Sequence, residues 1–282
     1  MPKRGGAKVS SGGNRLFAAA LVIGKARQAA VAAITGLTVL FAVSPASAYR
    51  PFDGTDAAVA DLGEVEIELQ PIGAMHTGST TKPISDGVLN FGFAERWELV
   101  LQTTAQPPPD GGAPFSVPDA ALLKYVVQPG VLQAKQGPSM AMEFGPLLPD
   151  VGGSGVGFSW SGIVSQRWDW GTVHFNVETN LTQDQHGELF FDAIIEGPNT
   201  WKVRPVFEIY SDSVINVSQT YSALAGAIWQ VNDKLSFDLA FRNALVDGHP
   251  VNELRAGMTF DFPVIFSQPV AAQAPLAGSR RQ

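Results

Sequence analysis

The chain has 282 residues, no cysteine and a formal net charge of −7. The lack of cysteine excludes a disulfide framework, thiolate chemistry and a cysteine-ligated zinc site. The acidic balance argues against a nucleic-acid-binding protein, because binding to phosphate backbones requires clustered lysine and arginine.

The first 48 residues have the pattern of a secretory signal peptide. Basic residues and no acids precede the apolar run AVAAITGLTVLFAV, which ends at the small-residue sequence Ala46-Ser47-Ala48. The run is shorter than the ~20 residues that a membrane-spanning helix needs. We therefore expect residues 1–48 to be cleaved during export, with a single N-terminal membrane anchor as the alternative.

Short runs of alternating apolar and polar residues fill the rest of the chain, and no long helical pattern separates them. This pattern predicts about twelve β-strands. The expected strands cover residues 64–74, 88–94, 97–105, 120–128, 139–146, 156–166, 171–180, 188–196, 200–210, 219–230, 235–243 and 252–262.

The connections between these runs alternate between two kinds. Short ones cover 94–96, 167–170, 197–200 and 231–234, whereas longer polar ones cover 76–87, 105–119, 147–155, 181–187, 211–218 and 244–251. The connection 129–138 belongs to the short series by order but is longer. Short turns at one end and long loops at the other are typical of outer-membrane barrels, in which closure satisfies every backbone group. We predict an all-β fold, a transmembrane up-and-down antiparallel barrel of about twelve strands over residues 64–262.

The tryptophans favour the same architecture. Five of the six lie beside the short connections, and only Trp160 lies within a run. In an up-and-down barrel this arrangement places them at one rim, where an aromatic belt meets lipid headgroups. Tryptophan packing at the hairpin ends of a soluble core is the alternative.

Alternation assigns one apolar and one polar face to the strands. Leu239 and Phe241 are expected to face lipid, and Asp238 and Arg242 the lumen. A soluble β-protein would also alternate, with its charges outside, so parity alone leaves the two open. The candidate lumen-lining residues are Glu66, Glu68, Glu98, Glu143, His174, Glu178, Lys202, Arg204, Glu208, Asp238, Arg242 and Arg255.

Two segments flank the expected barrel. Residues 49–63 form a turn-rich acidic leader, expected in the periplasm and a candidate plug for the lumen. The first strand is expected to close the ring against 252–262, with Arg255 as a partner for one of its glutamates. Residues 263–282 are interrupted by proline and are expected to form a flexible tail.

Catalytic and metal-binding patterns are weak. Ser159, Ser161 and Ser165 are on the expected strand next to His174, an adjacency compatible with a serine nucleophile and its base. Polar lining of a lumen explains the same residues, so we expect no enzyme activity and assign no catalytic residue. No two histidines have zinc-ligand spacing, and no metal or other cofactor is expected.

Three stretches resemble a bacterial family of outer-membrane barrels named after a phenol-degradation pathway. They are FDGTDAAVADLGEVEIELQP, GFAERWELVL and the closing VNDKLSFDLAF…NELRAGMTFDF. Distant relatives of that family are uptake barrels for fatty acids and aromatic hydrocarbons. The resemblance implies a passive uptake channel, for small solutes that include hydrophobic or aromatic ones, in the outer membrane of a Gram-negative bacterium.

The expected partners are outer-membrane lipid, the solute and the barrel-assembly machinery, and no nucleic acid. Two alternatives stay open. One is a structural or adhesive outer-membrane barrel without transport, and the other is a soluble periplasmic binder of the lipocalin type.

Overall fold

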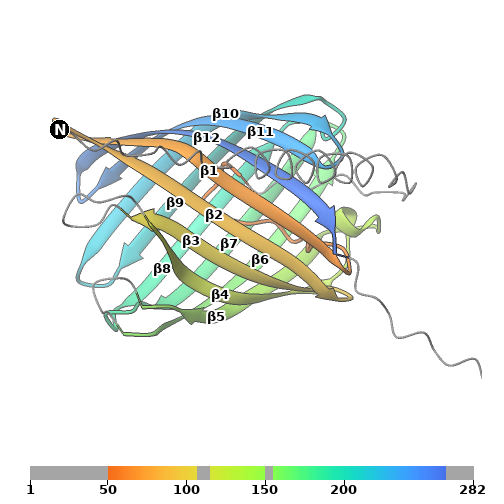
Figure 1. Cartoon of the computed structure of the whole chain (residues 1–282), viewed down its shortest axis with the longest axis horizontal. Coiled ribbons are helices and arrows are strands. Elements are labelled where there is room, and N and C mark those ends of the chain that lie inside the picture. Colours follow the sequence, from red (N-terminus) through yellow and green to blue (C-terminus); the bar gives the residue numbers. More distant parts are fainter. Residues whose placement is uncertain (1–49, 107–114, 150–154, 265–282) are drawn as a thin grey trace, which may run out of the picture. The chain divides into compact units, whose positions relative to one another are not determined.

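The computed structural model describes residues 50–106, 115–149 and 155–264. They form one closed sheet of antiparallel strands with a single short helical turn, η1 (Val131–Gln133) (Figure 1). The strands are β1 (Glu64–Thr77), β2 (Thr80–Ala94), β3 (Trp97–Gln106), β4 (Phe115–Gln128), β5 (Ser139–Leu147), β6 (Gly157–Trp168), β7 (Gly171–Leu181), β8 (Gly187–Glu196), β9 (Val203–Val214), β10 (Ser218–Asn232), β11 (Leu235–Val246) and β12 (His249–Pro263). Each strand pairs with its neighbours in sequence, so the predicted up-and-down barrel of about twelve strands is confirmed.

The ring closes where β1 pairs with β12, as predicted. The pairing runs from Glu64 opposite Pro263 to Thr77 opposite Val251. Closure leaves the described sheet without a free edge, so its strands can satisfy their backbone hydrogen bonds within the ring.

One irregularity interrupts β1 near its middle. The register shifts between Leu69 and Ile72 on the β12 side and between Gln70 and Gly73 on the β2 side. Pro71 lies within both intervals and has no backbone N–H to donate, so the ladder must be interrupted there. The side chain of Gln70, beside this bulge, is buried in the barrel.

Three connections that were predicted to be long are mostly strand. β1 and β2 are joined by residues 78–79, β9 and β10 by 215–217, and β11 and β12 by 247–248. Asp247 and Gly248 have φ angles of 50° and 78°, as the central residues of a two-residue type I′ hairpin require. The prediction was wrong because these strand ends carry polar residues on both faces, which resemble a loop in sequence.

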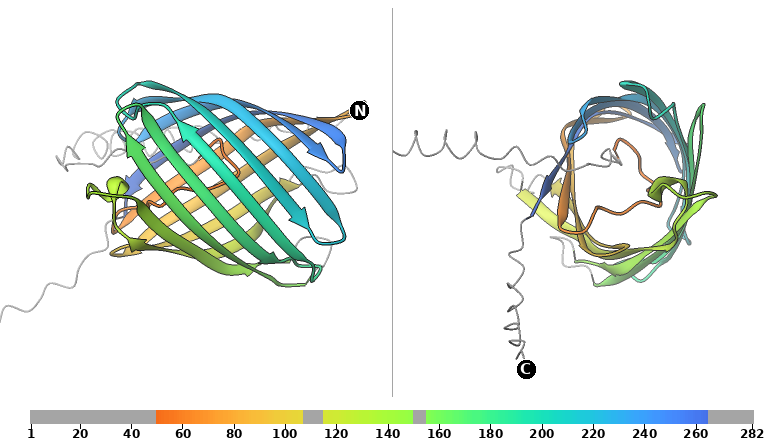
Figure 2. Two further views of the ribbon diagram at one scale, coloured as in Figure 1. Left: turned by 180° about the vertical axis from the view of Figure 1, so that it is seen from behind. Right: turned by 90° about the vertical axis from the view of Figure 1, so that its right-hand side faces the viewer.

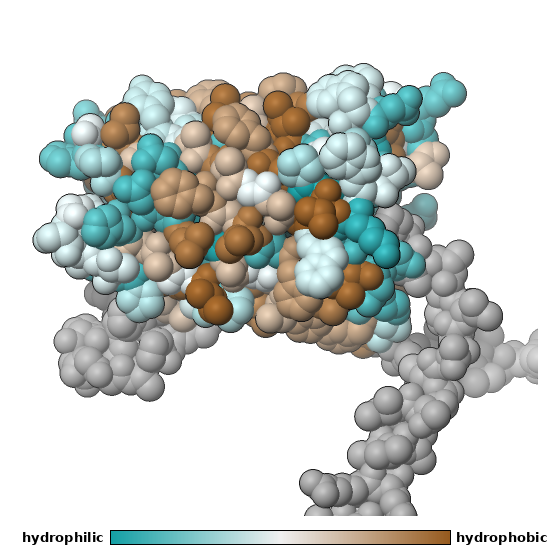
Figure 3. Space-filling model, turned by 90° about the horizontal axis from the view of Figure 1, so that it is seen from above, coloured by the Kyte–Doolittle hydropathy of each residue, from teal (hydrophilic) through white to brown (hydrophobic). Residues whose placement is uncertain are grey.

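The outer surface carries the apolar side chains and the interior the charged ones. Leu239 is 57% exposed and Phe175 55%, whereas Glu208 is 1% and Glu98 3% exposed. Figure 3 shows the apolar residues as a band between two more hydrophilic ends. This is the reverse of the arrangement in a water-soluble β-protein, whose charges face solvent.

Aromatic residues mark both borders of this band. Trp168, Trp170, Trp201 and Trp229 are exposed beside the short connections, and the Trp168 and Trp170 rings stack with centroids 5.4 Å apart. Trp160 is exposed near the start of β6, toward the opposite end of the barrel.

No helix within the described residues is long and apolar enough to span a membrane. The expected signal peptide at 1–48 lies outside the described residues. Of the expected tail at 263–282, Pro263 still belongs to β12, and the residues from 265 onward lie outside the described residues. Both remain predictions.

Candidate functional site

The lumen wall is built by the alternation of the strands, and it holds nearly all of the residues predicted to line it. Eleven of them are buried in the barrel or hydrogen-bonded to lumen side chains: Glu66, Glu68, Glu98, Glu143, His174, Glu178, Arg204, Glu208, Asp238, Arg242 and Arg255.

Lys202 is the exception. It is exposed in the turn before β9, and its carbonyl accepts a hydrogen bond of 2.8 Å from the Gln230 backbone. The strand starts at Val203 rather than at residue 200 because the chain is still turning there, with the Trp201 N–H bonded to the Pro198 carbonyl at 3.0 Å.

Residues 50–60 of the leader lie inside this lumen, whereas Asp61 and Leu62 are exposed just before β1. The end-on view in Figure 2 shows the leader crossing the interior of the ring. It contacts side chains from β1, β3, β4, β6, β7, β9, β11 and β12. The leader therefore crosses the central space of the barrel and is anchored on several sides of it.

The barrel holds the leader mainly through the leader's backbone. The Glu208 carboxylate accepts hydrogen bonds from the Asp53 and Gly54 N–H groups, at 2.8 and 2.9 Å. The Thr55 N–H donates to the Asn176 side chain at 3.2 Å, and the Ala60 N–H donates to Glu98. These bonds satisfy backbone groups that would otherwise be buried without partners.

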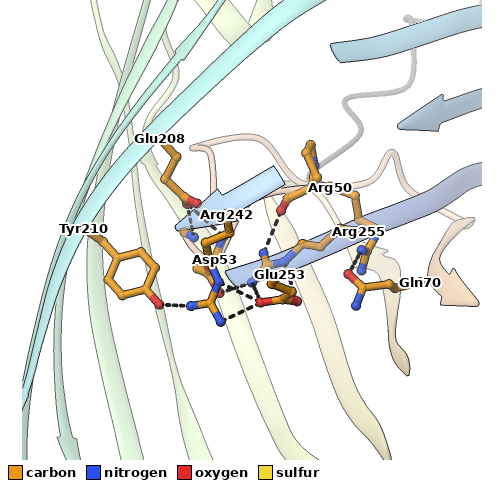
Figure 4. Close-up of polar contacts among 10 residues, drawn as sticks. Arg50, Asp53, Gln70, Glu208, Tyr210, Arg242, Glu253 and Arg255 are labelled. Carbon is orange, nitrogen blue, oxygen red and sulfur yellow. Dashed lines mark hydrogen bonds and ion pairs between the residues drawn. The ribbon is translucent and has the colours of Figure 1, made fainter. Parts of the chain in front are cut away.

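Arg255 joins the leader to the barrel wall through several hydrogen bonds (Figure 4). Its guanidinium group donates to the Pro51 carbonyl at 2.8 Å, to Asp53 at 2.9 Å and to Glu253 at 2.8 Å. The predicted pairing of Arg255 with a glutamate of the first strand was wrong. Arg255 lies opposite Gly73, beyond the β1 bulge, so the leader and its own strand supply the carboxylates.

Two further contacts extend this network. Arg242 pairs with Glu253 at 2.5 Å and donates a hydrogen bond to the Tyr210 hydroxyl. Arg50, at the start of the described leader, donates to Gln70 and lies 3.7 Å from Asp238. Basic and acidic side chains of the leader and of the barrel wall thus lie next to each other. Their attraction offsets part of the cost of removing each charge from water.

The leader carboxylate in this network is held in its charged form. Desolvation inside the barrel acts to raise the pKa of Asp53, but the Arg255 and Arg242 guanidinium groups outweigh it and hold that pKa below its ordinary value. Asp53 therefore remains ionised at neutral pH, and its contact with Arg255 remains an ion pair.

A second set of anchors holds the middle of the leader. Lys124 donates to the Thr55 hydroxyl at 2.9 Å and lies 3.8 Å from Asp56. From the connection between β4 and β5, the Gln133 side chain donates to the Ala57 carbonyl at 2.8 Å. This connection is longer than the others of the short series, and its extra residues allow Gln133 to reach into the lumen and hold the leader.

The serine and histidine that the sequence placed on neighbouring strands do meet. The Ser165 hydroxyl lies 2.8 Å from His174 Nδ1, and His174 Nε2 lies 3.3 Å from Glu196. Ser165 is fully buried, however, and its oxygen accepts the Ala57 N–H of the leader at 2.9 Å. With the leader in place a substrate carbonyl cannot approach this oxygen, so we describe the group as an anchor for the leader.

Several contributors to the site were missed at the sequence level. Glu253, Asp192 and Glu196 follow the same parity as the predicted lumen residues and could have been found from it. Arg50 and Asp53 could not, because they precede the first strand and have no alternation to orient them. Within the described residues, no group of three or more histidine or acidic side chains is placed to hold a metal ion.

No family model and no curated protein matches the chain. Among solved structures, it is similar to the KdgM porin in complex with disordered oligogalacturonate, at 8% identity over 71% of this chain and 99% of that chain, with a TM-score of 0.48. The CymD monoaromatic hydrocarbon channel matches at 7% identity over 72% of this chain and 89% of that one, with a TM-score of 0.46. An outer membrane channel from Pseudomonas putida F1 matches at 9% identity over 75% of this chain and all of that one, also at 0.46.

These identities and TM-scores are too low to carry an argument about function. The resemblance to the phenol-degradation family therefore stays an expectation, and the functional proposal rests on this chain's own residues.

Proposed function

We propose that the protein is an outer-membrane β-barrel channel of a Gram-negative bacterium for the passive uptake of small solutes, hydrophobic or aromatic ones included. The observation that carries this proposal is the inverted distribution of polarity in a closed barrel. The exposed side chains of Leu239, Phe175 and Phe207 are suited to contact with lipid. The side chains of Glu208 and Arg255, which point inward, are suited to a hydrated lumen. The soluble lipocalin-type alternative requires the opposite arrangement.

Location and partners follow from this proposal. The apolar band would contact outer-membrane lipid, with tryptophans at its border near the headgroups. Delivery to that membrane would use the signal peptide at 1–48 and the barrel-assembly machinery. The leader would narrow the lumen in the resting state, because its contacts span strands around the ring.

The lumen charge predicts a preference for cations. Among the described residues, the buried ionisable side chains comprise nine carboxyl groups and, besides His174, four basic groups. An excess of one charge in a confined channel concentrates the opposite ion. In planar bilayers separating unequal KCl solutions, we expect small single-channel currents. Their reversal potential should be shifted from zero toward the equilibrium potential of potassium.

A pair of glutamine substitutions sharpens this test. Glu178→Gln neutralises a lumen carboxylate that contacts Asn180 at 2.6 Å and, within the described residues, binds no group of the leader. It should move the reversal potential toward zero. Glu95→Gln, in the exposed turn between β2 and β3, is the matched control and should change it less. A sealed bilayer after verified insertion would contradict the channel and favour the structural or adhesive barrel.

A further inference from the structure

An apolar patch interrupts the charged lumen wall on β9, β10 and β11. The buried side chains of Val206, Leu224, Ile228 and Ala240 form this cluster, which we call the ring patch. Gly226 lies opposite both Val206 and Ala240 in the sheet register. The centre of the patch therefore consists of small residues, with Leu224 and Ile228 on either side of it along β10.

The surroundings of the ring patch are charged. Arg204 and Glu208 stand two residues to either side of Val206 on β9, and Asp238 and Arg242 stand likewise around Ala240 on β11. An apolar surface in such a wall costs free energy whenever water covers it, at roughly 25 cal/mol per Å². The patch is thus suited to an apolar occupant.

The leader supplies that occupant in this structure. The partly buried ring of Phe52 packs against the ring patch. Its backbone is fixed independently by its neighbours, because Arg255 binds the Pro51 carbonyl at 2.8 Å and Glu208 accepts the Asp53 N–H at 2.8 Å. The contact of the Phe52 ring with the patch is therefore additional to the hydrogen bonds that hold the leader backbone.

We propose that the ring patch is a solute-binding subsite for a single aromatic ring, and that Phe52 is an internal competitor that the solute displaces. This inference rests on the proposed channel function and adds to it the class of ligand and the place of binding. The charged border of the patch favours a ring that also carries a hydrogen-bonding group, such as an aromatic alcohol, over a bare hydrocarbon.

The test compares Phe52→Ala with the unchanged full chain in lipid nanodiscs, using 4-fluorobenzyl alcohol as the probe and its ¹⁹F NMR signal as the readout. When a competitor within the protein covers a site, the apparent affinity equals the intrinsic affinity multiplied by the fraction of time that the site is uncovered. If Phe52 covers the patch about nine-tenths of the time, Phe52→Ala should bind the probe roughly tenfold more tightly.

Two controls make the result specific. Phe190→Ala removes a lumen ring that packs at a tilt against Tyr210 and is not part of the patch, and it should leave probe affinity unchanged. Val206→Thr in the Phe52→Ala background keeps side-chain shape but adds a hydroxyl to the patch, and it should weaken binding. Unchanged affinity in Phe52→Ala, or an equal gain in Phe190→Ala, would overturn the proposal.

The outcome is separable from that of the channel itself. If ion currents are measured but Phe52→Ala does not bind the probe more tightly, the channel proposal stands and the subsite proposal is wrong. A gain in probe binding without ion currents would support the subsite and contradict the channel.

Discussion

A chain lacking residues 51–60 is expected to conduct several-fold more current per inserted channel than the full chain. The deletion removes the leader's contacts with Arg255, Glu208, Ser165 and Glu98 and so frees the centre of the lumen. It keeps Asp61–Gly63 because the Asp61 carbonyl bonds to the Glu64 N–H at 2.9 Å and the Gly63 carbonyl to the Val264 N–H at 2.7 Å. These bonds hold the start of β1.

Single-channel recording in planar bilayers measures this effect directly. As a control, deletion of residues 183–185 shortens the connection between β7 and β8, which is outside the leader contacts. That deletion should leave the conductance close to that of the full chain. An unchanged conductance after the leader deletion, in a barrel shown to be folded, would mean that the leader does not limit the current.

Leu239→Lys is expected to destabilise the folded protein in a lipid bilayer by about 2–4 kcal/mol, the cost of a lysine on the lipid face near the midplane. Leu239 is 57% exposed in the middle of β11, between Phe237 and Phe241 on the outer face. Its neighbours across the sheet, Ala227 and Ala256, offer no carboxylate partner.

Equilibrium unfolding by guanidinium in phospholipid vesicles gives the free energy of unfolding for this comparison. Leu245→Lys, near the end of the same strand, is the matched control and should cost about 0–1 kcal/mol because it lies near the interface. In a water-soluble barrel both substitutions are surface changes worth within about 0.5 kcal/mol. Equal small effects at the two positions would therefore argue against a membrane-spanning barrel.

The barrel itself could be predicted from the sequence because alternation and closure are local properties. The two faces of β11 follow from the alternation of apolar Leu239 and Phe241 with charged Asp238 and Arg242. An even number of strands in a membrane avoids unpaired edges by closing into a ring. The strand ends were less predictable. Beyond the apolar band both faces are polar, so the extensions of β9 and β10 have no alternation, although their backbone ladder continues.

One of these ends did carry a usable signal. The pair Asp247-Gly248 is a strong indicator of a two-residue hairpin, and both residues adopt the positive φ angles that this turn requires. Reading it as such would have joined β11 and β12 directly and shortened the expected loop at 244–251.

The lumen could be predicted as a list of residues but not as a network. Arg255 meets Pro51 and Asp53 across about two hundred residues of sequence, and Glu208 meets Asp53 and Gly54 across more than one hundred and fifty. No periodicity links a turn-rich leader to a strand so far away. Only the closed ring, which brings the two faces of the lumen together, determines these contacts.

A reversible lock on the leader tests most directly whether its place in the lumen sets the conductance. The Ala57 N–H donates to the Ser165 hydroxyl at 2.9 Å, and the chain has no native cysteine, so Ala57→Cys with Ser165→Cys introduces a single disulfide pair. With disulfide formation verified by mass, we expect the oxidised channel to stay in its low-conductance state and to regain openings after reduction. An oxidised, locked channel that conducts as much as the chain lacking residues 51–60 would contradict the account.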